Sequence, residues 1–300
     1  MSDVQHALSV DVEDWFQVLN MADHIDRADW DTYELRCVDS TRRLLELFDR
    51  RAAKATFFCL GWIAERMPEV IREIAAAGHE IGSHGYDHRI LPDLGQQGFR
   101  DDLERTAVIL EQLTGARPTA FRACTWSIGS KTPWAIDELV RSGITLDSSI
   151  QPVRTLDYGV PTAPTTPYRI TVGDGEQQRE LLEFPPLTWD VLGKHLPVGG
   201  GGYLRLFPLA LLRRGLRQKE RLGVPGCLYL HPWEVDPDQP RQRLGGLRGF
   251  RHYVNIRRTY DKLDRLLRDY RFVSLSSALA ARGESWRTKL PAWRANVLLG

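Results

Sequence analysis

Short apolar runs alternate with segments of helical periodicity along most of the chain. Residues 7–13, 54–62 and 79–84 are apolar, β-branched or aromatic, and they predict strands. Ser40 is placed to cap a helix between the first two strands, and Pro68 to begin another that stops at Gly78. The alternation continues with predicted helices over 99–113, 133–143, 208–223 and 258–270, and with extended runs at 118–124, 144–150, 226–234 and 272–275. This order predicts an α/β fold built on a parallel sheet or barrel.

The segment from about 151 to 204 interrupts this order. It is rich in proline and ends in the glycine run Gly199–Gly202, which favours long loops. We expect these loops, with a hairpin that includes residues 181–190, to cover one face of the fold. The predicted organisation is therefore a single domain over residues 1–283 with an insertion at about 151–204. Residues 284–300 form a C-terminal tail whose structure the sequence does not predict.

Composition places the chain among packed globular proteins. It has 300 residues, of which 42% are hydrophobic and 26% charged, and this excludes collagen, coiled coils and disordered chains. No apolar run reaches the roughly 18 residues of a membrane span, and no secretory signal is recognisable at the start. Four scattered cysteines without a CxxC pair are typical of reduced thiols. We therefore expect a cytoplasmic protein.

Charge is unevenly distributed although the net charge is only +1. Residues 201–300 hold 20 basic against 8 acidic residues, whereas residues 1–200 hold 20 against 31. Two interpretations stay open. The basic third is either a solvated surface with internal ion pairs or a face that docks an anionic glycan, a pyrophosphate carrier or the inner membrane surface. No nucleic-acid-binding motif accompanies the charge, so nucleic acid is not expected as a partner.

Two motifs at predicted strand ends offer metal ligands. His84 and His88 are four residues apart in SHGYDH, so a helical turn between them would direct both imidazoles to one side. The run Asp11-Val12-Glu13-Asp14 follows the first strand, and three crowded carboxylates are costly unless a cation or an arginine compensates them. Two histidines and one carboxylate form a recognised metal-binding set. Surface histidines and a helix-capping Asp14 remain the alternative interpretation.

Further polar residues end other predicted strands: Arg122 in FRAC, Asp147 in DSS and His231 in LYLHPWE. Parallel barrels place their active sites at the carboxyl ends of their strands. Each residue alone is also compatible with an ordinary ion pair, a strand cap or a buried histidine. Their shared position predicts one active site.

These five motifs, in this order, resemble the polysaccharide deacetylase family, the NodB-homology domain of carbohydrate esterase family 4. The segments VDVEDWFQV and HPWE resemble its exosortase-associated type. The resemblance covers roughly residues 5–280 and implies a deformed (β/α)7 barrel with long Pro/Gly-rich loops over one face. It also implies a metal-dependent hydrolase that removes N-acetyl groups from amino sugars.

The resemblance also implies roles for individual residues. Asp11 matches the catalytic base, Arg122 the arginine that pairs with it, and His231 the general acid, which Asp147 would orient. His84 and His88 match the metal histidines. The carboxylate ligand is either Glu13 or Asp14, because the family's adjacent aspartates are replaced here by Asp11-Val12. Zinc is the expected divalent metal, with cobalt, nickel and manganese as alternatives.

One position departs from the family, since Cys124 stands where the third motif has proline, which removes a backbone constraint. The oxyanion would lie against a backbone N–H of residues 124–126. Candidate substrate-binding residues, for which core packing is the alternative role, are Cys124, Thr125, Trp126, Trp189, Tyr203 and Trp233.

The sequence thus predicts a cytoplasmic N-deacetylase acting on an exopolysaccharide or on its lipid- or nucleotide-linked precursor. Two other functions stay open. One is hydrolysis of small cyclic amides or imides on the same fold, and the other is glycan binding with weak catalysis.

Overall fold

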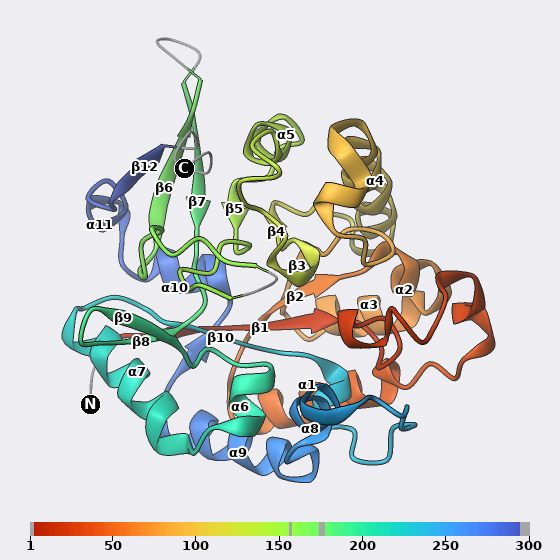
Figure 1. The fold of residues 1–300 in the computed structure, drawn as a ribbon. Coiled ribbons are helices and arrows are strands. Elements are labelled where there is room, and N and C mark those ends of the chain that lie inside the picture. The colour runs from red at the N-terminus through yellow and green to blue at the C-terminus, as the bar shows by residue number, and fades with distance from the viewer. Residues whose placement is uncertain (1–2, 156–157, 174–177, 295–300) are drawn as a thin grey trace.

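The computed structural model describes residues 3–155, 158–173 and 178–294. Their main sheet has the strand order β10-β1-β2-β3-β4-β5-β7-β6-β12, and β11 also pairs with β1 (Figure 1). The strands from β10 to β7 in this order are parallel neighbours, which confirms the predicted α/β class. The strands are β1 (His6–Val12), β2 (Thr56–Cys59), β3 (Glu80–Ser83), β4 (Ala120–Phe121), β5 (Leu146–Asp147), β6 (Tyr168–Val172), β7 (Arg179–Glu183), β10 (Cys227–Leu230), β11 (Phe272–Val273) and β12 (Ala292–Arg294).

The chain just after β7 returns to the opposite end of the parallel array. Pro186 forms an isolated parallel bridge with Cys227 of β10, and Gly200 forms another with Tyr229. Isolated bridges rather than a continuous ladder connect these two ends. The arrangement is compatible with the deformed barrel that the sequence resemblance implies.

Helices separate most of the parallel strands, as the sequence predicts (Figure 1). Proline begins α3 at Pro68, and Gly115 ends α4 in a left-handed conformation. Ser40, however, lies inside α1 rather than at its N-cap. The helices are α1 (Cys37–Arg50), α2 (Gly61–Arg66), α3 (Pro68–Ala76), α4 (Leu91–Thr114), α5 (Ala135–Arg141), α6 (Gly202–Leu206), α7 (Leu209–Arg221), α8 (Gly246–Tyr253), α9 (Ile256–Asp269), α10 (Leu275–Ala280) and α11 (Glu284–Arg287), with 3₁₀ turns η1 (Leu19–Met21), η2 (Arg27–Thr32), η3 (Cys124–Trp126) and η5 (Pro232–Val235).

Alternation along β1 explains how a polar site forms inside this core. Every residue of β1 is buried. Leu8, Val10 and Val12 belong to the largest hydrophobic cluster, together with apolar residues of α1 and α3. Ser9 and Asp11 alternate with them and therefore point to the other face of the sheet. That face can hold polar groups only where a partner satisfies them.

The expectation for residues 151–204 is wrong in part. This segment contributes β6 and β7 to the main sheet as an antiparallel pair, and a second hairpin joins β8 (Thr188–Val191) to β9 (Lys194–Pro197). Buried Leu181 and Leu182 hold β7 in the sheet despite the surrounding prolines. The glycine run passes along β10 so closely that a Cβ on Gly200 would lie 1.7 Å from the Tyr229 carbonyl oxygen. Gly200 also has φ +137°, so only glycine fits there.

The C-terminal segment is also more integrated than a tail. It forms α11 and then β12, which pairs in parallel with β6. Trp293 of β12 packs edge-on against Tyr168 of β6. Residues 295–300 of the predicted tail lie outside the described residues. None of the helices in the described ranges combines the length and apolar character that a membrane crossing requires.

Candidate active site

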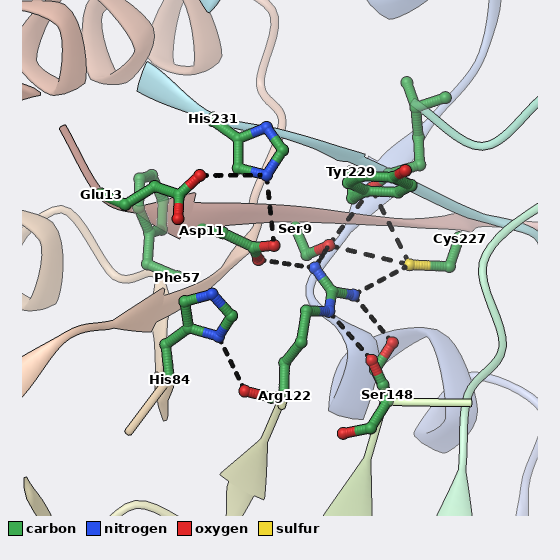
Figure 2. Close-up of polar contacts among 12 residues, drawn as sticks. Ser9, Asp11, Glu13, Phe57, His84, Arg122, Ser148, Cys227, Tyr229 and His231 are labelled. Atoms are coloured by element: carbon green, nitrogen blue, oxygen red, sulfur yellow. Dashed lines mark hydrogen bonds and ion pairs between the residues drawn. The ribbon is translucent and has the colours of Figure 1, made fainter. Parts of the chain in front are cut away.

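The predicted motifs meet where the parallel strands end. Asp11 lies near the end of β1, and His84, Arg122 and His231 directly follow β3, β4 and β10. Because these strands are parallel neighbours, their carboxyl ends share one edge of the sheet. Figure 2 shows the four side chains converging there. The structure therefore brings these four predicted residues together at one edge of the sheet.

Asp11 and Arg122 form a fully buried ion pair at this edge. Arg122 Nη1 donates to Asp11 Oδ1 and to Ser9 Oγ, both at 2.7 Å. Its Nη2 donates to Ser148 Oγ at 2.7 Å, and its Nε donates to the Ser148 carbonyl at 3.0 Å (Figure 2). Burial alone would lower the pKa of Arg122, but attraction from Asp11 outweighs it and raises that pKa. The guanidinium therefore keeps a fixed positive charge beside Asp11.

Glu13 faces the imidazoles. Its Oε2 lies 2.8 Å from His88 Nε2, and its Oε1 lies 3.4 Å from His231 Nε2. Burial would raise the pKa of Glu13, but the nearby His88 and His231 lower it to about 2. The Trp233 indole also donates to Glu13 Oε1 at 3.2 Å. Glu13 is thus a buried, ionised carboxylate directed at the histidines.

His84 and His88 come together without the helical turn that their spacing suggests. The chain between them bends, with Gly85 and His88 both at positive φ, and the ring centroids lie 5.5 Å apart. Arg27 donates to the carbonyls of Asp87 and His88, which stabilises this strained bend. His84 Nδ1 lies 2.7 Å from the Arg122 carbonyl. Burial lowers the pKa of His84 to about 4, so its ring is neutral and its Nε2 can serve as a ligand.

The donor set fits a divalent metal. Ligand-type atoms of His84, His88 and Cys124 lie within 4.8 Å of one another, and Glu13 contacts His88 directly. Two imidazoles with a buried carboxylate suit zinc and similar transition metals. The Cys124 thiol presently donates to the His84 carbonyl at 2.9 Å, and burial raises its pKa well above the usual value. Cys124 therefore supports His84 and does not line the cavity described below.

Asp14 has a different role from Glu13. Its Oδ2 accepts hydrogen bonds from the backbone N–H groups of Arg36 and Cys37, at 2.7 and 2.8 Å, and its Oδ1 accepts one from Trp15. Asp14 thereby caps the start of α1 from a distant point in the sequence. Both carboxylate oxygens are engaged by backbone, so the geometry favours Glu13 over Asp14 as the carboxylate ligand.

The expectation that Asp147 orients His231 is wrong in this structure. His231 Nδ1 lies 2.9 Å from Glu234 Oε2, and the same oxygen accepts from the His231 backbone N–H. Arg205 forms a buried ion pair with Glu234. Sequence reasoning missed Glu234 and Arg205 as site residues. The signal for Glu234 was its place three residues after His231 in HPWE, whereas nothing local marks Arg205 among many arginines.

Asp147 pairs instead with a second acid. Burial raises the pKa of Asp147 to about 6, and burial together with Asp147 raises the pKa of Glu183 well above its usual value. The Ser149 hydroxyl donates to Asp147 Oδ1 at 2.5 Å, and the Ile150 backbone N–H donates to Glu183. The neighbouring carboxyls on β5 and β7 therefore retain a proton between them. This pair lies outside the cavity lining.

A cavity of about 630 Å³ opens beside the converging side chains. Of the residues predicted to bind substrate, Thr125, Trp126, Tyr203 and Trp233 line it. Trp189 does not, because it is a partly buried residue on β8 that packs against the hydrophobic core. The remaining lining includes Asp11, Glu13, His84, His88, Tyr158, Arg205, Tyr229, His231, Arg248 and Arg251.

Comparisons with known proteins agree with this geometry. A family model described as polysaccharide deacetylase matches residues 29–142, and one described as a domain of unknown function, DUF3473, matches residues 148–280. The fold is similar to that of a solved structure from Mycobacterium smegmatis that is assigned to the polysaccharide deacetylases. The match covers 97% of this chain and 93% of the Mycobacterium smegmatis chain. The TM-score is 0.63 and the sequence identity 24%. That likeness shows the fold.

Curated relatives match over shorter segments. A peptidoglycan-N-acetylglucosamine deacetylase of Bacillus cereus is 35% identical over 85 residues, which are 28% of this chain and 31% of the relative. A peptidoglycan deacetylase of Helicobacter pylori is 32% identical over 132 residues, or 44% and 41% of the two chains. The chain thus spans less than half the length of these relatives. These matches make the chain similar to the polysaccharide deacetylase family over residues 29–142, and the motif residues gathered at its strand ends agree with that similarity.

Proposed function

We propose that this protein removes N-acetyl groups from amino sugars of an exopolysaccharide or of its lipid- or nucleotide-linked precursor. The observation that carries the proposal is the placement of Asp11 between Arg122 and His231 at the cavity. Asp11 Oδ1 contacts Arg122 at 2.7 Å, and Asp11 Oδ2 lies 3.7 Å from His231 Nε2. One carboxylate and one imidazole therefore face the same small space, as a base and an acid for amide hydrolysis must.

The residues divide the reaction between them. Arg122 places a positive charge 2.7 Å from Asp11, and Asp11 accepts the proton of the attacking water. Burial would lower the pKa of His231, but Glu13, Glu234 and Asp11 raise it to about 9, so His231 carries the proton that the departing amine requires. The Thr125 N–H makes no hydrogen bond in the described part of the chain and lies at the cavity, where it can stabilise the oxyanion.

Glu13, His84 and His88 would hold a divalent ion, with zinc as the first candidate. When bound, such an ion polarises the acetyl carbonyl and lowers the pKa of water. The His84 imidazole is held in one orientation by its contact with the Arg122 carbonyl. The metal site and the Asp11–Arg122 pair are therefore linked through the backbone of Arg122.

Substrate class is supported by the cavity and the comparisons. Trp126, Tyr203 and Trp233 offer aromatic surfaces within a volume that suits one or two sugar rings. DUF3473 occurs in deacetylases associated with exopolysaccharides, and the curated relatives are named for N-acetylated cell-wall glycans. We place the protein at the cytoplasmic face of the membrane; four cysteines without disulfides are in keeping with that compartment.

Acetate release tests the proposal. Wild-type protein should release acetate from N-acetylglucosamine oligomers, and a chelator should abolish this until zinc is restored. Asp11→Asn should lower the rate by about 10²- to 10⁴-fold because the base is removed, and His84→Ala should bind less metal. Glu180→Gln, on the exposed end of β7, is the control. Equal acetate release by wild type and Asp11→Asn would contradict the proposal, as would ring opening of cyclic imides without acetate release.

A further inference from the structure

Exposed apolar side chains gather at the rim of the cavity. In the described ranges, the large apolar residues that are exposed are Leu19, Val108, Leu192, Leu206, Leu222, Leu247 and Phe250. Leu19, Leu206 and Leu247 also line the cavity, and Phe250 lies one helical turn beyond Leu247 on α8. Four of the seven thus belong to one region, around α8 and the segments beside it.

α8 turns its apolar face outward. Leu247 and Phe250 are 71% and 56% exposed, and with Arg251 they lie on one side of the helix by their three- and four-residue spacing. The opposite side is fixed in the protein, because His252 is buried and stacks on Trp233 at 4.6 Å between ring centroids. A surface helix normally buries its apolar stripe. The orientation of α8 is therefore set by His252, and its outer face is left without a partner in the described chain.

The same region is strongly basic. Residues 239–260 contain six arginines and no acidic residue. Arg248 pairs with Asp23 at 2.7 Å, whereas the other five make no ion pair with any described residue. These five side chains are exposed and are Arg241, Arg243, Arg251, Arg257 and Arg258.

We propose that the outer face of α8, with Leu247, Phe250 and Arg251, docks on an anionic lipid bilayer together with the exposed arginines of the flanking segments 241–243 and 257–258. The arginines would contact lipid phosphates while Leu247 and Phe250 enter the interfacial layer, as in basic amphipathic surfaces that bind membranes. This inference rests on the proposed function in one respect: docking would bring the mouth of the cavity to the membrane, where a lipid-linked glycan is presented.

Other occupants fit the surface less well. A second copy of the chain would bring like-charged arginine clusters together across a two-fold interface, which is unfavourable. An anionic glycan would satisfy the arginines but would leave Leu247 and Phe250 exposed to water. A bilayer surface complements both the charge and the apolar residues.

Sedimentation with lipid vesicles tests the inference. Wild-type protein should sediment with phosphatidylcholine vesicles that contain phosphatidylglycerol and not with phosphatidylcholine alone, and high salt should release it. The double variant Phe250→Ser with Arg243→Glu should bind the anionic vesicles about tenfold less. Neither residue lines the cavity, so acetate release from soluble oligomers should be unchanged. A matched control, Leu222→Ser with Arg72→Glu, alters an exposed leucine and an exposed arginine elsewhere.

Three results would overturn the docking surface. The first is that the wild-type protein does not bind anionic vesicles. The second is that wild type and the α8 variant bind these vesicles equally. The third is that the wild-type protein binds no vesicles but forms a concentration-dependent dimer or binds an acidic glycan, and that the α8 variant loses this interaction. Vesicle binding without acetate release from any soluble glycan would uphold the surface and contradict the proposed function instead.

Discussion

Two buried arginine–carboxylate pairs flank His231, and they differ in how completely the arginine is satisfied. Arg122 donates to Asp11, Ser9 and Ser148. Arg205 donates to Glu234 and to the Arg251 carbonyl, but its Nε has no partner among the described residues. Burial lowers the pKa of Arg205 despite the attraction of Glu234, whereas Asp11 raises that of Arg122.

The difference shows how one site uses the same pair of residue types twice. Arg122 contacts the carboxylate proposed as base, so it affects the chemistry directly. Arg205 contacts Glu234, which in turn contacts His231 Nδ1, so Arg205 acts on the proposed acid only indirectly. Removing each partner should therefore give different losses.

The largest loss is expected for Arg122→Ala. Asp11 would stay buried without its cation, so the free energy of unfolding should fall by about 3–5 kcal/mol, as measured by urea unfolding. Arg205→Ala should lose less, because Glu234 keeps His231 as a partner. Arg72→Ala, an exposed arginine on α3, serves as control and should change stability by less than about 0.5 kcal/mol. A loss for Arg122→Ala no larger than that of the control would refute the comparison.

A smaller and more selective effect is expected for Glu234→Gln. The amide keeps the size of the side chain but no longer holds the charged imidazole, so kcat should fall about 10- to 100-fold. KM should stay near the wild-type value, whereas the urea midpoint should fall because the buried Arg205 loses its charged partner, so kcat is compared on the folded variant. Asp147→Asn is the informative counterpart, since the family resemblance implies this role for Asp147. If Asp147→Asn lowers kcat more than Glu234→Gln does, the assignment of Glu234 is incorrect.

The third prediction concerns how the free energy of unfolding depends on pH through Asp147 and Glu183. These two residues form a buried acid pair to which no described arginine is hydrogen-bonded. Its raised pKa values favour the protonated form in the folded state. The pair's contribution to stability is therefore fully present below about pH 4 and is lost as pH rises through about 6 and beyond.

Glu183→Gln tests this directly. Its stability relative to wild type should increase from pH 5 to pH 8, by on the order of 1–3 kcal/mol, in urea unfolding. Glu180→Gln on the same strand should show a difference from wild type that does not depend on pH. A parallel pH dependence for wild type and Glu183→Gln would exclude proton sharing by this pair.

Local patterns were sufficient for much of the fold and part of the site. Strand-to-helix alternation predicted β1 to β5 and most helices, because their apolar periodicity is strong. The same reasoning failed for β6, β7 and β12, where prolines and polar residues surround short buried segments such as Leu181 and Leu182. Besides the antiparallel pairing of β6 with β7, these strands are held by pairing of β7 with β5 and of β12 with β6, which no local pattern contains.

The site shows the same limit. Asp11, His84, Arg122 and His231 were predictable because each stands at the end of an apolar strand. The partners Ser9, Arg205 and Glu183 were not, since they act through contacts between distant segments. Asp147 illustrates the error that follows: it occupies a strand end, yet Glu183 on the neighbouring strand determines its chemistry.

Asp14 anchors the loop that carries Glu13 to the first turn of α1. Asp14, Arg36 and Cys37 do not line the cavity, so the position of Glu13 near His88 depends on a helix end outside the cavity lining. Substitutions at the start of α1 are therefore expected to weaken divalent-ion binding at the proposed site while every cavity side chain stays the same.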